Sequence, residues 1–264
     1  MYHLLTENFN EEQSQLLQII LEAVPAQQVY LLGSTLLQRR TETVFMPEAP
    51  SCRRAGHYYL LVLVKEEVNC AEMQDKLENT CRRLIPVTIL VMNSDSFIAW
   101  LLAGHAFAHT VQQRAVLLHG EAIVDPNLQA IEAPVPYAAK QKWQDQEKVK
   151  AFFAGAELFI IRKEYKMAAF MLHQCAEQAL LTLFKKGSGL HVNTHNLDKL
   201  VRYCTMVNYT ISDILPRNNE QQERLFQLLQ RAYIDTRYKN DYNITLADLE
   251  AIKAMLAKLL EIMC

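Results

Sequence analysis

Apolar and polar residues follow two different rhythms along the chain. In the first half, segments with helical spacing alternate with short, continuous apolar runs rich in β-branched and aromatic residues, which are typical of buried strands. The predicted helices are residues 10–24, 71–84 and 94–111, and the predicted strands are residues 27–33, 57–65, 86–93 and 114–120. This alternation predicts a small α/β domain.

In the second half, the apolar positions recur only with helical spacing. The predicted helices are residues 143–163, 166–186, 195–206, 218–239 and 246–262. Their wide apolar faces predict a helical bundle. Residues 131–140 carry two prolines and no periodicity, which indicates a linker near residues 125–141. The predicted fold class is α+β, with an α/β domain at residues 1–124 and an all-α bundle at residues 142–264.

Charge and composition narrow the class of protein. The net charge is −2, yet residues 1–135 carry −6 and residues 136–264 carry +4. A domain with a charge of +4 can bind nucleotides or RNA without being a strongly basic nucleic-acid protein. The six cysteines form no Cys-x-x-Cys pair, so we expect reduced thiols and no zinc. Because we find neither a long apolar run nor a secretory signal, we expect a cytoplasmic protein with no membrane partner.

The first predicted strand leads into Gly33 and Ser34, which we expect to form a turn at its end. A Gly-Ser strand end followed about two dozen residues later by a strong strand resembles the polymerase-β-like nucleotidyltransferase fold. In that family, acids in a pattern like Asp-x-Asp-Leu-Leu-Val, with a third acid on the next strand, hold two Mg²⁺ ions. Here His57 and Tyr59 stand in place of the first two acids, and residues 86–93 contain none. The resemblance therefore implies an inactive domain without metal, in which Gly33 and Ser34 form either a vestigial phosphate site or an ordinary turn.

The helical half carries a second motif. Its residues are Phe170, His173, Gln174, Glu177 and Leu180, followed by Thr194, His195 and Leu197. This pattern resembles the signature of HEPN domains, in which a Phe-x-x-(His/Gln)-Gln-x-x-Glu-x-x-(Leu/Ile) helix precedes a Thr-His-x-Leu helix start. The resemblance implies a HEPN bundle and a homodimer formed through this domain.

Many HEPN domains resemble one another in being metal-independent ribonucleases, with a motif of an Arg followed four to six residues later by a His. Arg237 matches the Arg, but Tyr242 stands five positions on, and its ordinary pKa of about 10 makes tyrosine a poor base. Both are weak catalytic candidates. Arg237, Tyr238 and Lys239 bring phosphate-binding groups to one helix end. Alternatively, Arg237 is a helix C-terminal cation paired with Asp241.

Two pairs of histidines allow a structural or a functional interpretation. His105 and His109 lie one helical turn apart, where a metal pair is conceivable, but the sequence favours ordinary surface or core histidines. His173 and His195 are expected to meet inside the bundle, because the HEPN resemblance brings their helices together. We expect them to be hydrogen-bonded structural residues rather than catalytic ones.

Three functions follow from these observations. The leading hypothesis is a non-catalytic or weakly catalytic two-domain module that binds a nucleotide or RNA, acts with a protein partner that the sequence does not identify, and is related to toxin–antitoxin or defence-type pairs. The first alternative is an active ribonuclease that takes its histidine from elsewhere, such as His173 or His195. The second is a dimeric scaffold without a ligand. We expect no cofactor and no metal.

Overall fold

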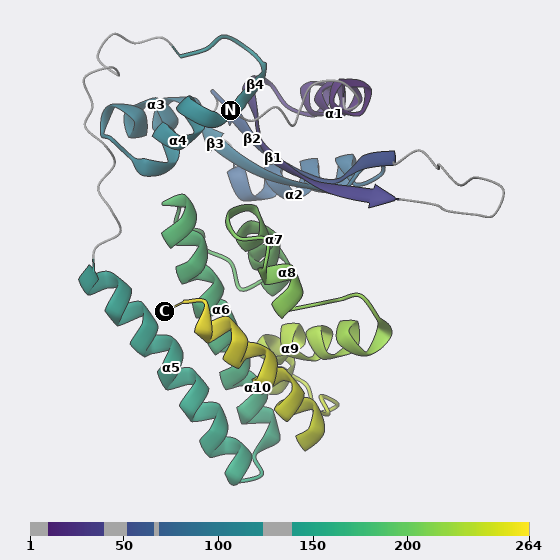
Figure 1. Cartoon of the computed structure of the whole chain (residues 1–264), viewed down its shortest axis with the longest axis vertical. Helices are drawn as coiled ribbons and strands as arrows, with labels where there is room; N and C mark the ends of the chain where they lie inside the picture. The colour runs from purple at the N-terminus through teal and green to yellow at the C-terminus, as the bar shows by residue number, and fades with distance from the viewer. Residues whose placement is uncertain (1–9, 40–51, 66–68, 124–138, 264) are drawn as a thin grey trace, which may run out of the picture. The chain divides into compact units, whose positions relative to one another are not determined.

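The computed structural model describes residues 10–39, 52–65, 69–123 and 139–263, and the chain divides into two compact units (Figure 1). The units are Met1–Pro134 and Val135–Cys264. Most of the predicted linker, residues 125–141, lies outside the described residues, and the first helix of the second unit begins at Ala139. Among the described residues, none of the helices has the length and apolar character that crossing a membrane requires.

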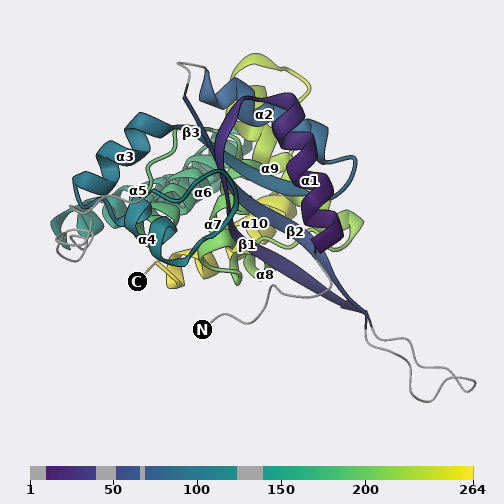
Figure 2. The same ribbon diagram turned by 90° about the horizontal axis from the view of Figure 1, so that it is seen from above.

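The first unit is a four-stranded mixed sheet with helices packed against it (Figure 2). The helices are α1 (Asn10–Ala23), α2 (Cys70–Cys81), α3 (Ser94–Leu102) and α4 (Ala106–Arg114), and the strands are β1 (Ala26–Arg39), β2 (Cys52–Val64), β3 (Val87–Asn93) and β4 (Val116–His119). The strand order is β3-β2-β1-β4, with β2 parallel to β3 and β1 antiparallel to both β2 and β4. The order of elements is the predicted one, except that two helices lie between β3 and β4 where one was predicted.

Side chains alternate between the two faces of the sheet, and each face packs against different helices. Alternate residues of β2, such as Tyr58, Leu60 and Val62, share one core with Leu16 of α1 and Leu77 of α2. Side chains on a strand point alternately to its two faces, so the residues between them face the opposite side. On that side the ring of Tyr30 lies 6.2 Å from the ring of Phe97 of α3.

The expected turn at Gly33 and Ser34 is wrong. β1 continues through both residues, which pair with Tyr59 and Tyr58 of β2, although the register shifts just before them, between Leu31 and Gly33, and again between Thr35 and Leu36. A Cβ atom on Gly33 would meet no atom within 4 Å, so the glycine is not needed to avoid a clash. Because the strand continues to Arg39, Gly33 and Ser34 do not lead directly into a helix N-terminus that could bind a phosphate.

The predicted helix 94–111 is also wrong, because the chain forms two helices there. Asn93 caps α3, since its side chain accepts from the backbone N–H groups of Asp95 and Ser96. Gly104 has a φ of 72°, a left-handed conformation that ends the first helix, and α4 begins two residues later.

The second unit is a helical bundle. Its helices are α5 (Ala139–Ile161), α6 (Tyr165–Ser188), α7 (Leu197–Val207), α8 (Ile211–Ile214), α9 (Glu220–Tyr238) and α10 (Leu246–Glu261). α6 is the central helix, since it packs against α5, α7, α9 and α10. A capping box of Thr245 and Asp248 opens α10, and Asp248 also pairs with Arg224 of α9. The described helices confirm the bundle that the periodicity predicts.

Candidate functional site

A buried carboxylate lies at the centre of a polar cluster in the helical unit. Glu177, on α6, is only 3% exposed. Its Oε2 atom lies 3.0 Å from Nδ1 of His195 and 3.4 Å from Nε2 of His173. The side chain of His195 is 53% exposed, whereas that of His173 is fully buried. One carboxylate therefore joins a buried imidazole to one that faces the solvent.

A backbone carbonyl fixes the ring of His173. Its Nδ1 atom lies 2.9 Å from the carbonyl oxygen of Leu229 on α9. Because a carbonyl only accepts, Nδ1 carries the hydrogen and donates it. The Nε2 atom is within ion-pair distance of Glu177, but it has no hydrogen-bond partner of good geometry among the described residues. His173 thus links α6 to α9.

Opposing effects act on the pKa of Glu177. Burial raises it, but the contacts with the imidazoles of His173 and His195 lower it by more, so the pKa lies below its ordinary value of 4.5. Gln178 also donates from Nε2 to Oε1 of Glu177, at 3.1 Å. The carboxylate is therefore ionised at neutral pH and accepts a hydrogen bond from His195.

The ring of Tyr233, on α9, brings His195 close to Arg237. The ring centroids of Tyr233 and His195 are 4.5 Å apart and the rings are stacked, with 18° between their planes. The Cζ atom of Arg237 lies 4.3 Å from the centroid of the same Tyr233 ring. An exposed imidazole and a guanidinium therefore lie within about 9 Å of each other, because both contact one aromatic ring.

Aromatic contacts, rather than an acid, hold Arg237. Its Nε donates to the carbonyl oxygen of Tyr233 at 2.8 Å, and its Cζ lies 5.6 Å from the centroid of the Phe170 ring. No carboxylate of a described residue forms an ion pair with it, so the alternative pairing with Asp241 is not formed. Cation–π contacts orient a guanidinium without neutralising its charge. Arg237 is thus exposed, oriented and available to an anion.

The other residues predicted beside Arg237 occupy different environments. Tyr238 is 76% exposed. The ammonium of Lys239 lies 3.0 Å from Oδ1 of buried Asp235, so an ion pair already occupies it. Tyr242 is 1% exposed and donates its hydroxyl hydrogen to the carbonyl oxygen of Leu228 at 2.9 Å. Burial raises the pKa of Tyr242, which makes this phenol a still weaker base than the sequence suggested.

The positions of the missing acids lie on β2. Nε2 of His57 lies 2.8 Å from Oγ1 of Thr88 on β3, and its ring centroid is 4.8 Å from that of Tyr59. Imidazole and phenol are poor ligands for Mg²⁺, a hard cation that prefers carboxylate and water oxygens. Gly33 and Ser34 face Tyr59 and Tyr58 across the ladder, and neither lies beside a basic side chain in the strand pairing.

His105 and His109 have local structural partners. His105 caps α4, where Nδ1 accepts from the backbone N–H of Phe107 at 3.3 Å. Nε2 of His109 lies 3.0 Å from the carbonyl oxygen of Leu101. Within the described ranges of the chain, no group of three or more His, Cys, Asp or Glu side chains could hold a metal ion.

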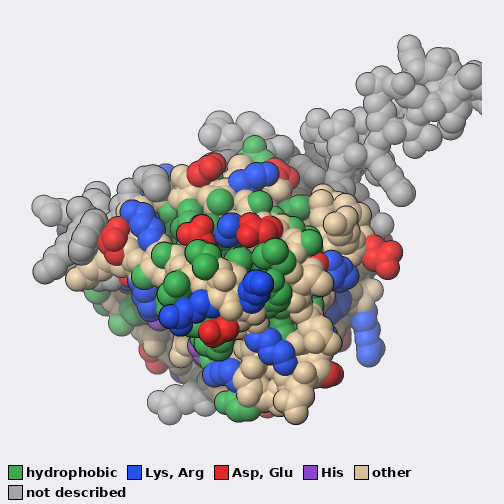
Figure 3. Space-filling view, turned by 90° about the horizontal axis from the view of Figure 1, so that it is seen from below, with side chains coloured by type: hydrophobic (Ala, Val, Ile, Leu, Met, Phe, Trp, Pro, Cys, Tyr) green, Lys and Arg blue, Asp and Glu red, His purple; other side chains and the backbone are tan. Residues whose placement is uncertain are grey.

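Exposed apolar side chains gather near Arg237. The ends of α5 and α9 and the starts of α6 and α10 lie together, since Lys166 donates to the carbonyl oxygen of Asn240 at 3.0 Å and Lys253 lies 3.8 Å from Glu157. Six of the nine exposed large hydrophobic residues among those described belong to these helix ends: Leu158, Ile161, Met167, Ile234, Tyr238 and Leu246. Figure 3 shows hydrophobic side chains intermixed with basic and acidic ones on the face seen from below.

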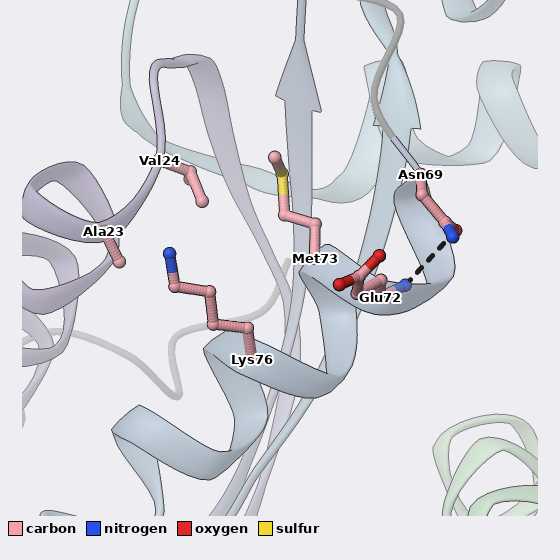
Figure 4. Close-up of a pocket in the computed structure, with 6 residues that line it drawn as sticks. All are labelled: Ala23, Val24, Asn69, Glu72, Met73 and Lys76. Carbon is pink, nitrogen blue, oxygen red and sulfur yellow. Dashed lines mark hydrogen bonds between the residues drawn. The ribbon is translucent and has the colours of Figure 1, made fainter.

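A pocket in the first unit is a weak alternative site. It has a volume of about 230 Å³ and lies between the end of α1 and the start of α2 (Figure 4). Its lining residues are Ala23, Val24, Asn69, Glu72, Met73 and Lys76. Ligand pockets usually measure about 300–1,000 Å³. The side chain of Asn69 is also already used, because it accepts from the backbone N–H of Glu72.

Comparisons with known proteins bear on the two units differently. A HEPN domain family model matches residues 146–264. Among solved structures, a crystal structure of a nucleotidyltransferase-like protein from Exiguobacterium sibiricum 255-15 is 13% identical, with 96% of this chain and 90% of that chain covered and a TM-score of 0.26. No curated protein matches the sequence significantly.

The residues that match the HEPN family model include the whole polar cluster around Glu177 and Arg237. Glu177, His195, Tyr233 and Arg237 all lie inside the matched residues, as do the helices that carry or flank them. The motif that predicted the family from the sequence lies on α6 and at the start of α7. Residues 146–264 of the chain therefore form a HEPN domain.

Proposed function

We propose that the HEPN domain binds the phosphate of a nucleotide or of RNA at Arg237. The observation that carries the proposal is the state of this guanidinium: it is exposed, held over Tyr233 and Phe170, and not paired with a carboxylate of any described residue. Arginine suits this role because its planar donors match two phosphate oxygens at once.

The surroundings of Arg237 support a nucleotide over a simple anion. Tyr238 is 76% exposed, and its ring centroid lies 5.2 Å from Cζ of Arg237. Aromatic side chains that face solvent stack on bases, and stacking together with a nearby cation is a common way to bind single strands. The charge of +4 on residues 136–264 adds a modest attraction for phosphate.

In this proposal the first unit contributes no catalysis. The acids that would hold Mg²⁺ in a nucleotidyltransferase are replaced by His57 and Tyr59. We further propose that the ligand-bound protein acts with a protein partner, as in toxin–antitoxin or defence-type pairs.

A thermal-shift screen of nucleotides and short RNAs tests the proposal. A ligand that binds only the folded protein raises the unfolding temperature, and the rise grows with the logarithm of the ligand concentration above its dissociation constant. We expect at least one phosphate-bearing ligand to stabilise the wild type and to stabilise the Arg237→Ala variant less. If no nucleotide or RNA shifts the wild type at low salt, the scaffold alternative is correct.

A further inference from the structure

We propose that the edge of β1 from Gly33 to Arg39 binds an extended, acidic segment of a partner protein, which adds a strand to the sheet. This assignment rests on the part of the proposed function in which the chain acts with a protein partner. The edge belongs to the first unit, so it is independent of a phosphate ligand at Arg237.

The two edges of the sheet are closed to different extents. On the outer strand β3, the backbone N–H of Ile89 donates to Oε1 of Glu78 at 3.1 Å, and Glu78 is 8% exposed. At the other edge, β4 pairs with β1 only at Val29, Tyr30 and Leu31. Beyond these residues, no strand of the described part of the chain borders β1 on the side away from β2. Proteins usually cover or block such an edge, because its unpaired N–H and C=O groups can pair with another chain.

The direction of the backbone groups of Ser34 follows from its partner across the ladder. Ser34 pairs with Tyr58 of β2, whose own N–H donates to the carbonyl oxygen of Pro86 at 3.1 Å, on the side of β3. In an antiparallel ladder, the residue opposite one that turns away from the pair also turns its groups away. The N–H and C=O of Ser34 therefore point to the open edge, whereas those of Gly33 and Thr35 face β2. A further strand can pair with Ser34 without disturbing the ladder between β1 and β2.

The described residues leave space beside this edge. Thr35 is exposed, Gly33 and Ser34 are partly exposed, and a Cβ atom on Gly33 would meet no atom within 4 Å. A glycine inside a strand often marks a place where another backbone approaches closely. The far ends of β1 and β2 also extend beyond the other two strands, as Figure 2 shows. An incoming segment therefore has access to a stretch of β1 that pairs only with β2.

Charge indicates which segment fits this edge. The last three rungs of the ladder between β1 and β2 each contain an arginine, namely Arg39, Arg53 or Arg54, and residues 33–39 and 52–59 contain no acid. Two copies of the chain that paired edge to edge would place like charges on neighbouring strands, which disfavours that pairing. A segment with Asp or Glu complements the arginines. The unpaired backbone groups favour a polypeptide over a nucleic acid, because strand addition uses N–H and C=O groups in register.

A peptide selection tests this assignment. A display library of short random peptides is selected on the full chain, and the enriched peptides are synthesised with a fluorescent label. Anisotropy gives their affinity for the wild type, for Ser34→Pro and for the double variant Arg53→Glu, Arg54→Glu. The matched control is Ser34→Ala, which keeps the outward N–H that Ser34→Pro removes. Circular dichroism checks the folding of each variant.

We expect the enriched peptides to carry Asp or Glu among β-branched residues and to bind Ser34→Ala as they bind the wild type. Ser34→Pro should weaken their binding by about tenfold, because a backbone hydrogen bond and the room for the neighbouring strand are lost together. The double arginine variant should also bind more weakly, and the difference should shrink as salt is added. Arg237→Ala should bind the peptides as the wild type does, so a failure at this edge leaves the proposed phosphate site intact.

Two results with peptides overturn the assignment: no peptide is enriched, or the enriched peptides bind folded Ser34→Pro or the double arginine variant as tightly as the wild type. If Ser34→Pro does not fold, hydrogen exchange of the wild type decides, because a bound peptide must slow exchange in the segment that contains Ser34. Unchanged exchange there overturns the assignment. Slower exchange there with a short single-stranded RNA would assign the edge to a nucleic acid instead. A lower mass of Ser34→Pro than of the wild type in light scattering would assign it to a second copy of the chain, and either result overturns the assignment to an acidic partner.

Discussion

Two glycines in neighbouring helices should respond oppositely to the same substitution. Gly187 lies one residue from the end of α6, and a Cβ atom there would come within 2.8 Å of Cβ and 3.0 Å of Cγ2 of Val207. Gly155 lies inside α5, where a Cβ atom would meet Sδ of Met171 at 3.6 Å, an ordinary contact. The chain therefore contains a matched pair that separates helix propensity from packing.

The magnitudes follow from these contacts. Alanine is favoured over glycine inside a helix by about 0.5–1 kcal/mol, and Gly155→Ala should gain roughly this amount. Gly187→Ala meets a Cβ atom that is bonded directly to the backbone and cannot rotate away. Inserting a methyl into a filled space costs about 1–3 kcal/mol, so we expect a net loss of about 1–2 kcal/mol. The position near the helix end reduces the compensating gain.

Urea unfolding followed by circular dichroism measures both effects, and hydrogen exchange of the α6 peptides assigns them to the helical unit. The dependence on urea should be unchanged, since neither substitution alters the surface exposed on unfolding. The double substitution Gly187→Ala, Val207→Gly removes the side chain that the new methyl meets, and so should relieve the clash and cost less than the two changes added together. If Gly187→Ala is as stable as the wild type, the close packing of α6 against Val207 is wrong.

Three other measurements test separate features of the HEPN domain. Because the pKa of Glu177 in the folded protein is lowered below 4.5, the ionised carboxylate stabilises the fold above that pH, and this stabilisation is lost as the pH falls through the folded pKa. Acid should therefore destabilise the wild type more than it destabilises Glu177→Gln. Equal acid sensitivity of the two proteins would contradict this. Tyr242→Phe should lose about 1 kcal/mol in urea unfolding, the value of the hydrogen bond to Leu228, without changing RNA affinity; weaker RNA binding would give Tyr242 a direct role. We expect light scattering to detect a dimer of the wild type. The substitution Ile161→Glu should dissociate this dimer, because it places a charge among the apolar helix ends at a residue that is 77% exposed. A monomeric wild type would contradict that expectation.

The sequence predicted correctly whether most segments are helices or strands, because the spacing of apolar residues in a long segment shows which of its faces is buried. The predictions from the sequence were wrong where contacts between distant segments determine the structure. β1 extends past Gly33 because β2 pairs with it along its length, and no local signal distinguishes this from a turn. The break at Gly104 was visible as a glycine, but a glycine within an apolar helical pattern is often tolerated.

The candidate site was only half predictable. The motif named Glu177 and His195, and the spacing named Arg237, but their meeting requires the packing of α7 and α9 against α6. Tyr233 was not among the predicted site residues. Its position four residues before Arg237 on one helix was the available signal, since side chains at that spacing are neighbours. The ion pair that occupies Lys239 depends on Asp235, also four residues earlier, and could have been found in the same way.

The most direct test of the proposed phosphate site compares two cations at one helix end. Aromatic rings orient Arg237, and no carboxylate of the described residues forms an ion pair with it, whereas Lys239 forms an ion pair with Asp235. The measurement is fluorescence anisotropy of a labelled single-stranded RNA at low salt, with the full chain and the variants Arg237→Ala and Lys239→Ala. A hydrogen-bonded charge contributes about 1.5–3 kcal/mol, so Arg237→Ala should weaken binding by about 10- to 100-fold. Lys239→Ala should bind as the wild type does. Equal affinity of wild type and Arg237→Ala, or a larger loss for Lys239→Ala, would contradict the assignment of Arg237 as the phosphate ligand.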